Sequence, residues 1–495
     1  MRYFLILFFL ASSFQLEAKF EVNDNMKNAY SYIINLDIEN AKNLLSKERQ
    51  INPNNGIVDL YENYIDFLHL LTSGEDEVLF QELNKNKLKR IRNIKRNDNI
   101  SPYYLYSQAE IHLQWAFTRI KFGEYVTGAY EIQKAYFLLK KNERIFPNFY
   151  LNNKNLAVLY ALIGSIPKQY QWLTGLIGME GDIHKGLSEL NNFFYLTQTD
   201  PEYEQYNIET ILLLSFLQMN ISNENKDYEE LLSTIHDKYK TNKLLKLCAA
   251  RLAHKLGDNK LSLQILNHIP PEDKTLPIYY FDYLLGMSEL YNLNYEIASR
   301  YFKRFLQNSR GRKHYIKSSY HKLALISFLL GNDQSMSHYF NLILLNGDIF
   351  IDEDKKAQLD AERKKIYHQS LLKSQLLYDG GYYKQSLLEL EKSSKSLFNQ
   401  NDISEYWYRK GRIAQRMHEP PSKIIEYFSQ SYNKGQGLKA YFPPMSSLQI
   451  GYEYEKLGNI SKARAFYKKC LLFSNFDYER GIHQKAKVAL TRLNR

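Results

Sequence analysis

The fold is decided by a stretch near the C-terminus, SSLQIGYEYEKLGNISKARAFYKKCLLF, residues 446–473. Within it, Gly451 is followed twelve residues later by Ala463. Tyr467 and Cys470 continue the pattern at steps of four and three. Such steps place side chains on one face of a helix, and the Leu-Gly pair in the middle is typical of a helix end. The stretch therefore predicts two helices joined by a tight turn.

The same spacing recurs at seven places, each of which begins at a small residue. Those residues are Ala29, Ala116, Ala250, Gly286, Ala324, Ser374 and Gly451. A small residue in the first helix lets the second helix approach closely, and a bulky side chain of the second helix fills the groove between them. No run of alternating apolar residues predicts a strand. The sequence therefore predicts an all-α fold of repeated helical hairpins.

This pattern resembles the signature of the tetratricopeptide-repeat (TPR) family, in which a small residue, an alanine, an aromatic and a second small residue occur at these spacings. Trp407, four residues before Gly411, matches the tryptophan of that signature. The resemblance covers most of residues 25–490 and implies a right-handed α-solenoid. Successive small residues from Ala250 to Gly451 lie more than 34 residues apart. We therefore expect longer helices or loops than those of the family.

The N-terminus, MRYFLILFFLASSFQLEAKF, combines a positive charge at Arg2 with a short apolar run that ends at Ala11. The run is shorter than the roughly 20 residues that span a bilayer. It is typical of a secretory signal peptide with cleavage after Ala18; a first structural helix is the alternative. We therefore expect a bacterial protein that is exported to the periplasm or secreted.

The length of the chain bears on its domains, because one compact core seldom grows beyond roughly 250–300 residues and this chain has 495. We expect a signal peptide over residues 1–18, an N-terminal array over residues 19–270 and a C-terminal array over residues 271–495. The signal peptide holds one Arg and one Glu, so the mature chain keeps the net charge of +11. Export argues against nucleic acid as a partner, and the charge favours anionic lipid, glycan or acidic protein surfaces.

An apolar insert at residues 166–182 interrupts the N-terminal array, within IPKQYQWLTGLIGMEGDIHKGLSEL. Two interpretations stay open for Tyr170, Trp172 and Leu176: a plug packed inside the array, or a contact surface for a partner or lipid. The segment is similar to part of the inclusion-body-clearance family of TPR proteins, a similarity carried by Pro167, Gly178, Gly181, Asp182, Gly186, Leu187 and Leu190. That family is associated with lipid handling inside cells, a setting from which an exported protein departs.

Motifs of common enzymes and metal sites are missing from the sequence, which contains no HExxH, paired CxxC, GxSxG or Walker loop. The acidic segment at residues 348–356 lacks the glycine and the distal glutamate of a calcium loop, and predicts a charged helix start. We therefore expect no catalytic residue, no metal and no cofactor. The basic segment NKNKLKRIRNIKRN, residues 84–97, could contact an anionic membrane surface; a solvated helix face is the alternative.

A partner site follows from the resemblance, because in stacked TPR hairpins the first helices line a concave groove. Helical spacing then selects the positions three before and one, four and five after each small residue. These positions hold Tyr283, Tyr291, His321, Tyr408, Arg412, Arg416, Tyr452 and Lys456. Tyr and Arg are frequent in binding hot spots, although the chain has 41 Tyr and frequency alone is an alternative.

We therefore predict a non-enzymatic scaffold that binds an acidic or extended segment of another protein in this groove. Two alternatives stay open at this point. One is a carrier of lipid or glycan. The other is a cell-wall enzyme with a helical superhelix, for which the repeats leave no room near the C-terminus.

Overall fold

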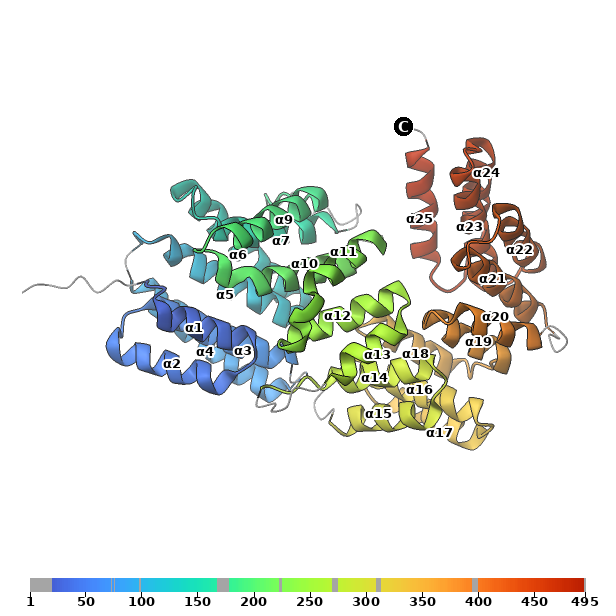
Figure 1. The fold of residues 1–495 in the computed structure, drawn as a ribbon, viewed down its shortest axis with the longest axis horizontal. Helices are drawn as coiled ribbons and strands as arrows, with labels where there is room; N and C mark the ends of the chain where they lie inside the picture. Colours follow the sequence, from blue (N-terminus) through green and yellow to red (C-terminus); the bar gives the residue numbers. More distant parts are fainter. Residues whose placement is uncertain are drawn as a thin grey trace, which may run out of the picture. The chain divides into compact units, whose positions relative to one another are not determined.

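The computed structural model describes residues 20–72, 74, 76–97, 99–166, 178–221, 225–268, 275–308, 313–393 and 399–493. All regular structure in these ranges is helical, so the predicted all-α class is confirmed (Figure 1). The chain divides into two compact units: unit 1 is Met1–Cys248 with Pro270–Ile278, and unit 2 is Ala249–Ile269 with Tyr279–Arg495. The division falls inside α12 (Lys243–Leu256), whereas the sequence predicts a boundary after residue 270.

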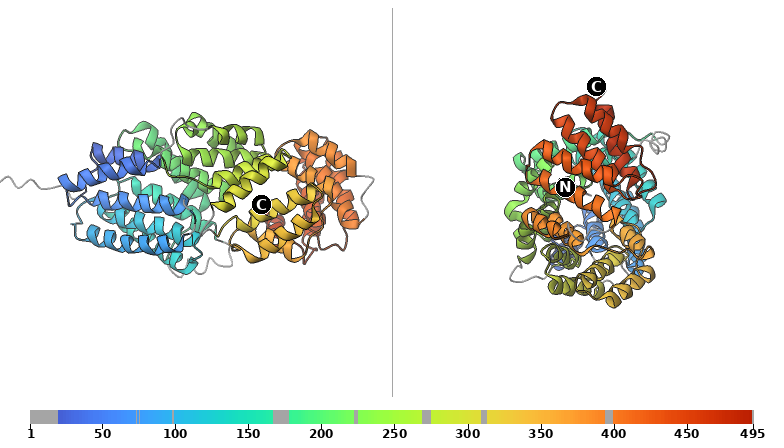
Figure 2. Two further views of the ribbon diagram at one scale, coloured as in Figure 1. Left: turned by 90° about the horizontal axis from the view of Figure 1, so that it is seen from below. Right: turned by 90° about the vertical axis from the view of Figure 1, so that its right-hand side faces the viewer.

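Unit 1 consists of helical hairpins that lie side by side, in blue to green in Figures 1 and 2. Its helices are α1 (Asp24–Ile34), α2 (Ile38–Ile51), α3 (Gly56–Thr72), α4 (Glu77–Lys95), α5 (Pro102–Lys121), α6 (Tyr125–Ile145), α7 (Leu151–Gly164), α9 (Ile183–Thr199), α10 (Asn207–Ile221) and α11 (Asn225–Ile235), with short 3-10 helices at Glu204–Tyr206 and His236–Lys240. Within hairpins, α1 packs on α2, α3 on α4, α5 on α6 and α7 on α9. The first helices α1, α3, α5 and α7 also contact one another in sequence order.

Unit 2 continues the same construction. Its helices are α13 (Asn259–Asn267), α14 (Tyr280–Tyr291), α15 (Tyr295–Gln307), α16 (Ile316–Leu329), α17 (Asp333–Leu345), α18 (Asp352–Glu362), α19 (Gln369–Asp379), α20 (Tyr383–Lys392), α21 (Gln400–Arg416), α22 (Pro421–Lys434), α23 (Phe442–Lys456), α24 (Ile460–Cys470) and α25 (Glu479–Arg492). Five hairpins, from α14/α15 to α23/α24, pack helix against helix, and α25 packs on α24.

Eight of the hairpins share one type of turn. The first helix ends, one residue adopts a positive φ, and the next residue leads into the second helix; the positive-φ residues are Leu36, Gly123, Gly257, Leu293, Gly331, Gly381, His418 and Gly458. A left-handed residue is a common way to end a helix. The side chains of Asp37, Asp258, Asn332 and Asn459 then accept a backbone N–H of the following helix, which caps its N-terminus. The recurrence confirms the predicted repeat.

The small residues of the pattern have the predicted role. A Cβ atom added to the glycine would lie 2.8 Å from the Phe302 ring at Gly286, 2.7 Å from the Phe428 ring at Gly411 and 2.3 Å from the Tyr467 ring at Gly451. These gaps are too small for a Cβ atom, because protein interiors are already close-packed. Each glycine therefore lets an aromatic ring of the second helix fill the hairpin.

In the hairpin α7/α9 the two backbones approach each other closely. A Cβ atom on Gly186 would lie 2.5 Å from the carbonyl oxygen of Ala157. The Asp182 side chain accepts the N–H of Lys185 at 3.0 Å and so caps the N-terminus of α9, and the Asp182 N–H donates to the carbonyl of Tyr160 at 3.0 Å. These contacts explain the glycine and aspartate pattern of this segment in terms of packing.

Helix α18 is an addition to the hairpin series. It begins at Asp352, as the charged segment predicts, and packs on α16 and α17. The buried carboxylate of Asp354 accepts the N–H groups of Tyr315 and Ser318, at 2.7 and 2.8 Å, where α16 begins. The extra helix accounts for the wide spacing between Ala324 and Ser374.

Two turns of unit 2 that are distant in sequence contact each other directly. Gly257, before α13, and Gly381, before α20, both have positive φ, and a Cβ atom on Gly381 would lie 1.7 Å from the Gly257 carbonyl oxygen. Beside them, the Asn259 N–H donates to the Gly380 carbonyl at 3.3 Å. Only glycine combines this backbone conformation with so close an approach.

Candidate functional site

The sequence-predicted groove positions divide into two groups. Three of them, Tyr283, His321 and Tyr408, are buried, so the prediction that they are exposed is wrong. All three lie three residues before a small residue of the pattern. The physical reason is that this position faces the next first helix along the array: the Tyr283 hydroxyl, on α14, lies 2.8 Å from Ser318 Oγ, on α16.

The other two buried positions are also covered by the element that follows along the array: His321 by α18 and the segment after it, and Tyr408 by the next first helix, α23. His321 Nε2 lies 2.9 Å from the Tyr367 hydroxyl and 3.2 Å from a carboxylate oxygen of Asp360. Burial lowers the pKa of His321 to about 4, although the hydrogen bond to Asp360 acts in the opposite direction. The Tyr408 ring packs against Phe442, with ring centroids 5.6 Å apart. These side chains hold neighbouring hairpins together rather than face a partner.

The remaining predicted positions keep solvent contact. Tyr291, Arg412, Arg416 and Tyr452 are half-buried, and Lys456 is exposed and lies 3.0 Å from Glu453. Partner binding by these five residues stays a prediction. The insert residues Tyr170, Trp172 and Leu176 lie outside the described residues, so both interpretations of the insert stay open.

A ladder of polar side chains, which sequence reasoning missed, links three first helices of unit 2. Arg409 donates to Gln375 Oε1 at 2.8 Å, Arg412 donates to the Tyr378 hydroxyl at 3.0 Å, and Gln415 donates to Gln449 Oε1 at 3.0 Å. Each pair is 34 residues apart, and α19, α21 and α23 contact one another in this order. In the sequence, the ladder could have been predicted from polar residues that recur 34 positions apart on successive first helices.

Four cations gather along this face, and we call them the cationic cluster: Lys322, Arg409, Arg412 and Arg416. The charges of the first three act on the single carboxylate of Asp379 at the end of α19. Arg409 also pairs with Glu405 on its own helix. Among the described residues, no carboxylate lies within ion-pair distance of Arg412 or Arg416. This face therefore carries a net positive charge.

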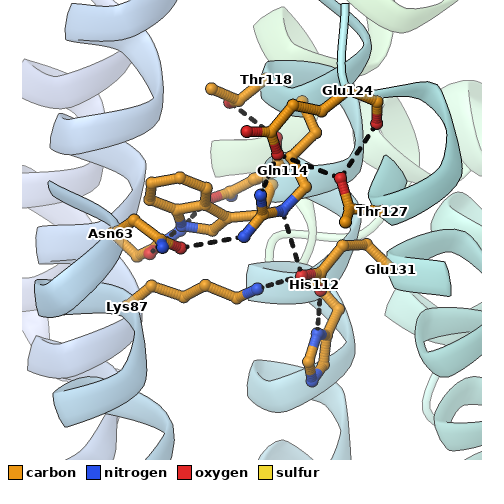
Figure 3. Close-up of polar contacts among 11 residues, drawn as sticks. Asn63, Lys87, His112, Gln114, Thr118, Glu124, Thr127 and Glu131 are labelled. Atoms are coloured by element: carbon orange, nitrogen blue, oxygen red, sulfur yellow. Dashed lines mark hydrogen bonds and ion pairs between the residues drawn. The ribbon is translucent and has the colours of Figure 1, made fainter. Parts of the chain in front are cut away.

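A second polar cluster lies in unit 1 and joins α4, α5 and α6 around Glu131 (Figure 3). Lys87 of α4 forms an ion pair with this carboxylate, His112 Nδ1 lies 2.5 Å from it, and Arg119 Nε donates to it at 3.3 Å. Beside it, Asn63 of α3 accepts from the Trp115 indole at 3.0 Å. Lys87, His112 and Glu131 are all buried. The cluster therefore fixes the rotation of α4 and α6 about their axes.

Electrostatics keep the carboxylate of Glu131 ionised. Burial raises the pKa of Glu131, but the hydrogen bond from His112 and the charge of Lys87 outweigh burial and bring the pKa down to about 2. Burial lowers the pKa of His112 despite the nearby carboxylate. A neutral His112 that donates its Nδ1–H to an ionised Glu131 fits both shifts. His112 and Glu131 resemble an acid–base dyad, but both side chains are buried and form contacts that hold helices together.

A third cluster connects the first helices of unit 1. Lys154 of α7 is fully buried, and its ammonium donates to Glu209 at 2.6 Å and lies 3.8 Å from Glu110. The hydroxyls of Tyr30 and Tyr64 donate to Glu209 at 2.6 and 2.9 Å. Burial alone lowers the pKa of Lys154, but the two carboxylates raise it, so the ammonium stays charged.

Neither unit offers a metal site or a bilayer-spanning helix in its described part. No three His, Cys, Asp or Glu side chains of the described ranges are placed to hold a metal ion. None of the helices within those ranges has the length and apolar character needed to cross a membrane.

Comparison with protein-family models finds no match, and comparison with curated proteins finds none either. Among solved structures, the chain is similar to the yeast Tom70, at 10% identity over 95% of this chain and 88% of that chain, with a TM-score of 0.24. It is also similar to the APC/C hetero-tetramer Cut9-Hcn1, at 12% identity over 94% of this chain and 95% of that chain, with a TM-score of 0.23. Both are TPR-repeat proteins. Since these TM-scores are low, the description of the fold rests on the hairpins themselves.

Proposed function

We propose that the protein is an exported, non-enzymatic scaffold that binds an acidic, extended segment of another envelope protein through the cationic cluster of unit 2. The observation that supports this proposal is the environment of the Arg412 and Arg416 side chains. Both are half-buried and lack a carboxylate partner among the described residues. Arg412 is held in place by the Tyr378 hydroxyl.

The physical argument concerns charge and pre-organisation. An arginine guanidinium presents donors in a planar fork that matches a carboxylate. Because Arg412 is already oriented by a hydrogen bond to the neighbouring hairpin, little side-chain freedom is lost when a carboxylate binds. An acidic segment along α19, α21 and α23 would therefore gain charge-assisted hydrogen bonds at a small entropic cost.

The test compares Arg412→Ala/Arg416→Ala with a control, Arg300→Ala/Lys303→Ala, which removes two exposed cations from α15. Each protein is used to capture partners from the native cell envelope, and each is titrated with a fluorescent poly-glutamate peptide. We expect the cluster variant, but not the control, to lose its captured partners and its affinity for the peptide. Tyr408 is left intact because its truncation would destabilise the hairpin. A folded cluster variant that keeps every partner would refute the proposal.

Export is the second part of the proposal, and it is supported by the charged start and the apolar run of residues 1–18. Cell fractionation and N-terminal sequencing of the mature protein test it; we expect a mature chain that begins at Lys19. An N-terminus at Met1 in a cytoplasmic fraction would refute export.

The proposal includes two further binding partners, an anionic membrane surface and a lipid or glycan. One is peripheral contact of residues 84–97 with an anionic membrane surface, supported by the exposed cations of α4. The other, an alternative to the scaffold, is a lipid or glycan carried by the protein; mass spectrometry of material that copurifies with the chain would detect it.

A further inference from the structure

Two buried ion pairs fix the direction in which α4 presents its cations. Lys87 pairs with Glu131, and Arg90 pairs with Asp66, and all four side chains are buried. Because these two cations face inward, the others face solvent. From Lys85 to the C-cap of α4, the exposed residues of this face are Lys85, Leu88, Lys89, Arg92, Lys95 and Arg96; the acidic Glu82 is exposed one turn earlier.

Helix α6 presents a second stripe of the same character. Its exposed residues are Val126, Tyr130, Lys134, Phe137, Lys141 and Arg144. They recur at spacings of three and four, which places them on one side of the helix. Val126 is 86% exposed, and Lys134 Nζ lies 4.4 Å from the centre of the Tyr130 ring. No acidic residue occurs in the stripe.

The two helices are neighbours, because the buried ion pair between Lys87 and Glu131 joins α4 directly to α6, and each helix carries its stripe on a side that faces away from this pair. We call them together the basic face. Five cations of α4 and three of α6 contribute to it, and none of these eight has a carboxylate within ion-pair distance in the described part of the chain. By contrast, Lys140 of α6, which lies outside the stripe, is paired with Glu143 at 2.6 Å.

We propose that unit 1 docks on the surface of an anionic lipid bilayer through the basic face. This extends the membrane contact proposed for residues 84–97 to a second helix and is independent of partner binding by unit 2. Exposed aliphatic and aromatic side chains flanked by lysine and arginine suit the boundary between headgroups and acyl chains. The apolar side chains enter that boundary while the cations stay with the anionic headgroups.

The apolar content of the basic face favours a bilayer over other polyanions. Val126 and the 55% exposed Leu88 gain nothing from the phosphate backbone of a nucleic acid, which attracts charge alone. A second copy of the same face is disfavoured because it would bring like charges together. If the basic face binds an acidic protein instead of a bilayer, the wild-type protein will not bind anionic vesicles in the test below.

The test measures flotation of the full chain with vesicles of phosphatidylcholine, with and without phosphatidylglycerol, at low and high salt. We expect binding only when phosphatidylglycerol is present, and weaker binding at high salt because exposed charges are screened. Lys89→Glu/Arg92→Glu/Arg96→Glu should reduce binding by at least about tenfold, since each cation near an anionic surface adds to adsorption. Val126→Ser/Tyr130→Ser should reduce it as well, without a change of charge.

The matched control is Arg300→Glu/Lys303→Glu/Lys468→Glu, which makes the same change of charge on exposed residues of unit 2. We expect it to bind vesicles like the wild type, as should Arg412→Ala/Arg416→Ala, so that failure of this proposal is distinguishable from failure of the scaffold. Wild-type protein that ignores anionic vesicles, or basic-face variants that bind as well as the control, would overturn the proposal. Loss of vesicle binding equal in all charge variants would show a net-charge effect and overturn it too.

Discussion

Replacing Glu131 with Gln removes the one carboxylate that serves Lys87, His112 and Arg119 together. The substitution keeps the size of the side chain, so the effect reports charge rather than packing. Lys87 is only 3% exposed, and removal of one partner from a buried ion pair typically costs about 3–5 kcal/mol. We expect the free energy of unfolding of unit 1 to fall by this amount at neutral pH.

The pKa of Glu131 gives the same magnitude by a separate argument. It is about 2 in the folded protein, against an ordinary value of 4.5. A lowered pKa stabilises the fold above the unfolded-state value, and this stabilisation is lost as the pH falls through 4.5 towards 2. At 1.36 kcal/mol per pKa unit, the loss amounts to about 3 kcal/mol. The wild type should therefore lose more stability than Glu131→Gln over this pH range, until the two converge.

Trp115 is a suitable probe because its ring centre lies 5.5 Å from Lys87 Nζ. Urea unfolding would be followed by its fluorescence in a Trp172→Phe/Trp407→Phe background, at pH values between about 7 and 2. Glu82→Gln, at an exposed position of α4, is the control and should leave the curve unchanged. A difference between wild type and Glu131→Gln that stays constant across the pH series would refute this reasoning.

Two further predictions concern the hairpin cores. Gly451→Ala should lower the melting temperature and cost about 1–3 kcal/mol, because overpacking displaces neighbouring groups and the new Cβ would lie 2.3 Å from the Tyr467 ring. Gly481→Ala, where no atom lies within 4 Å of the added Cβ, is the control; equal melting of both variants would contradict the packing argument. Cys470 is fully buried, and burial raises its pKa to about 12. A disulfide-exchange reagent at mildly alkaline pH should therefore label it only after unfolding, and rapid labelling of the native chain would contradict its burial.

The parts of the fold that depend on local spacing could be predicted from the sequence. The contact between Gly451 and Tyr467 lies within one hairpin, so helical periodicity and a turn signal are enough to predict it. The start of α18 at Asp352 was likewise predictable from its acidic segment. Its position between two hairpins was not, since nothing in the segment indicates that Asp354 caps another helix.

The candidate site was harder to predict because its residues are placed by contacts between hairpins. Tyr283 and Tyr408 sit on the first helices, as expected, but the next hairpin covers them. The side on which one first helix meets the next depends on how the hairpins stack, which the sequence of a single hairpin does not contain. The buried Lys154 could have been noticed as a charge among the apolar residues of its helix; its pairing with Glu209, 55 residues away, required the structure.

The contact between the turns at Gly257 and Gly381 affects how unit 2 comes apart. In an ordinary repeat array each hairpin touches only its neighbours, so the ends can fray one repeat at a time. Here the close approach of Gly257 and Gly381, together with the hydrogen bond from the Asn259 N–H to the Gly380 carbonyl, joins α12/α13 to α19/α20, across two intervening hairpins and α18. Detachment of α19/α20 must break that contact and expose both turns at once. The hairpins enclosed by it consequently gain or lose their structure as one block, and fraying from the C-terminal end stops where that block begins.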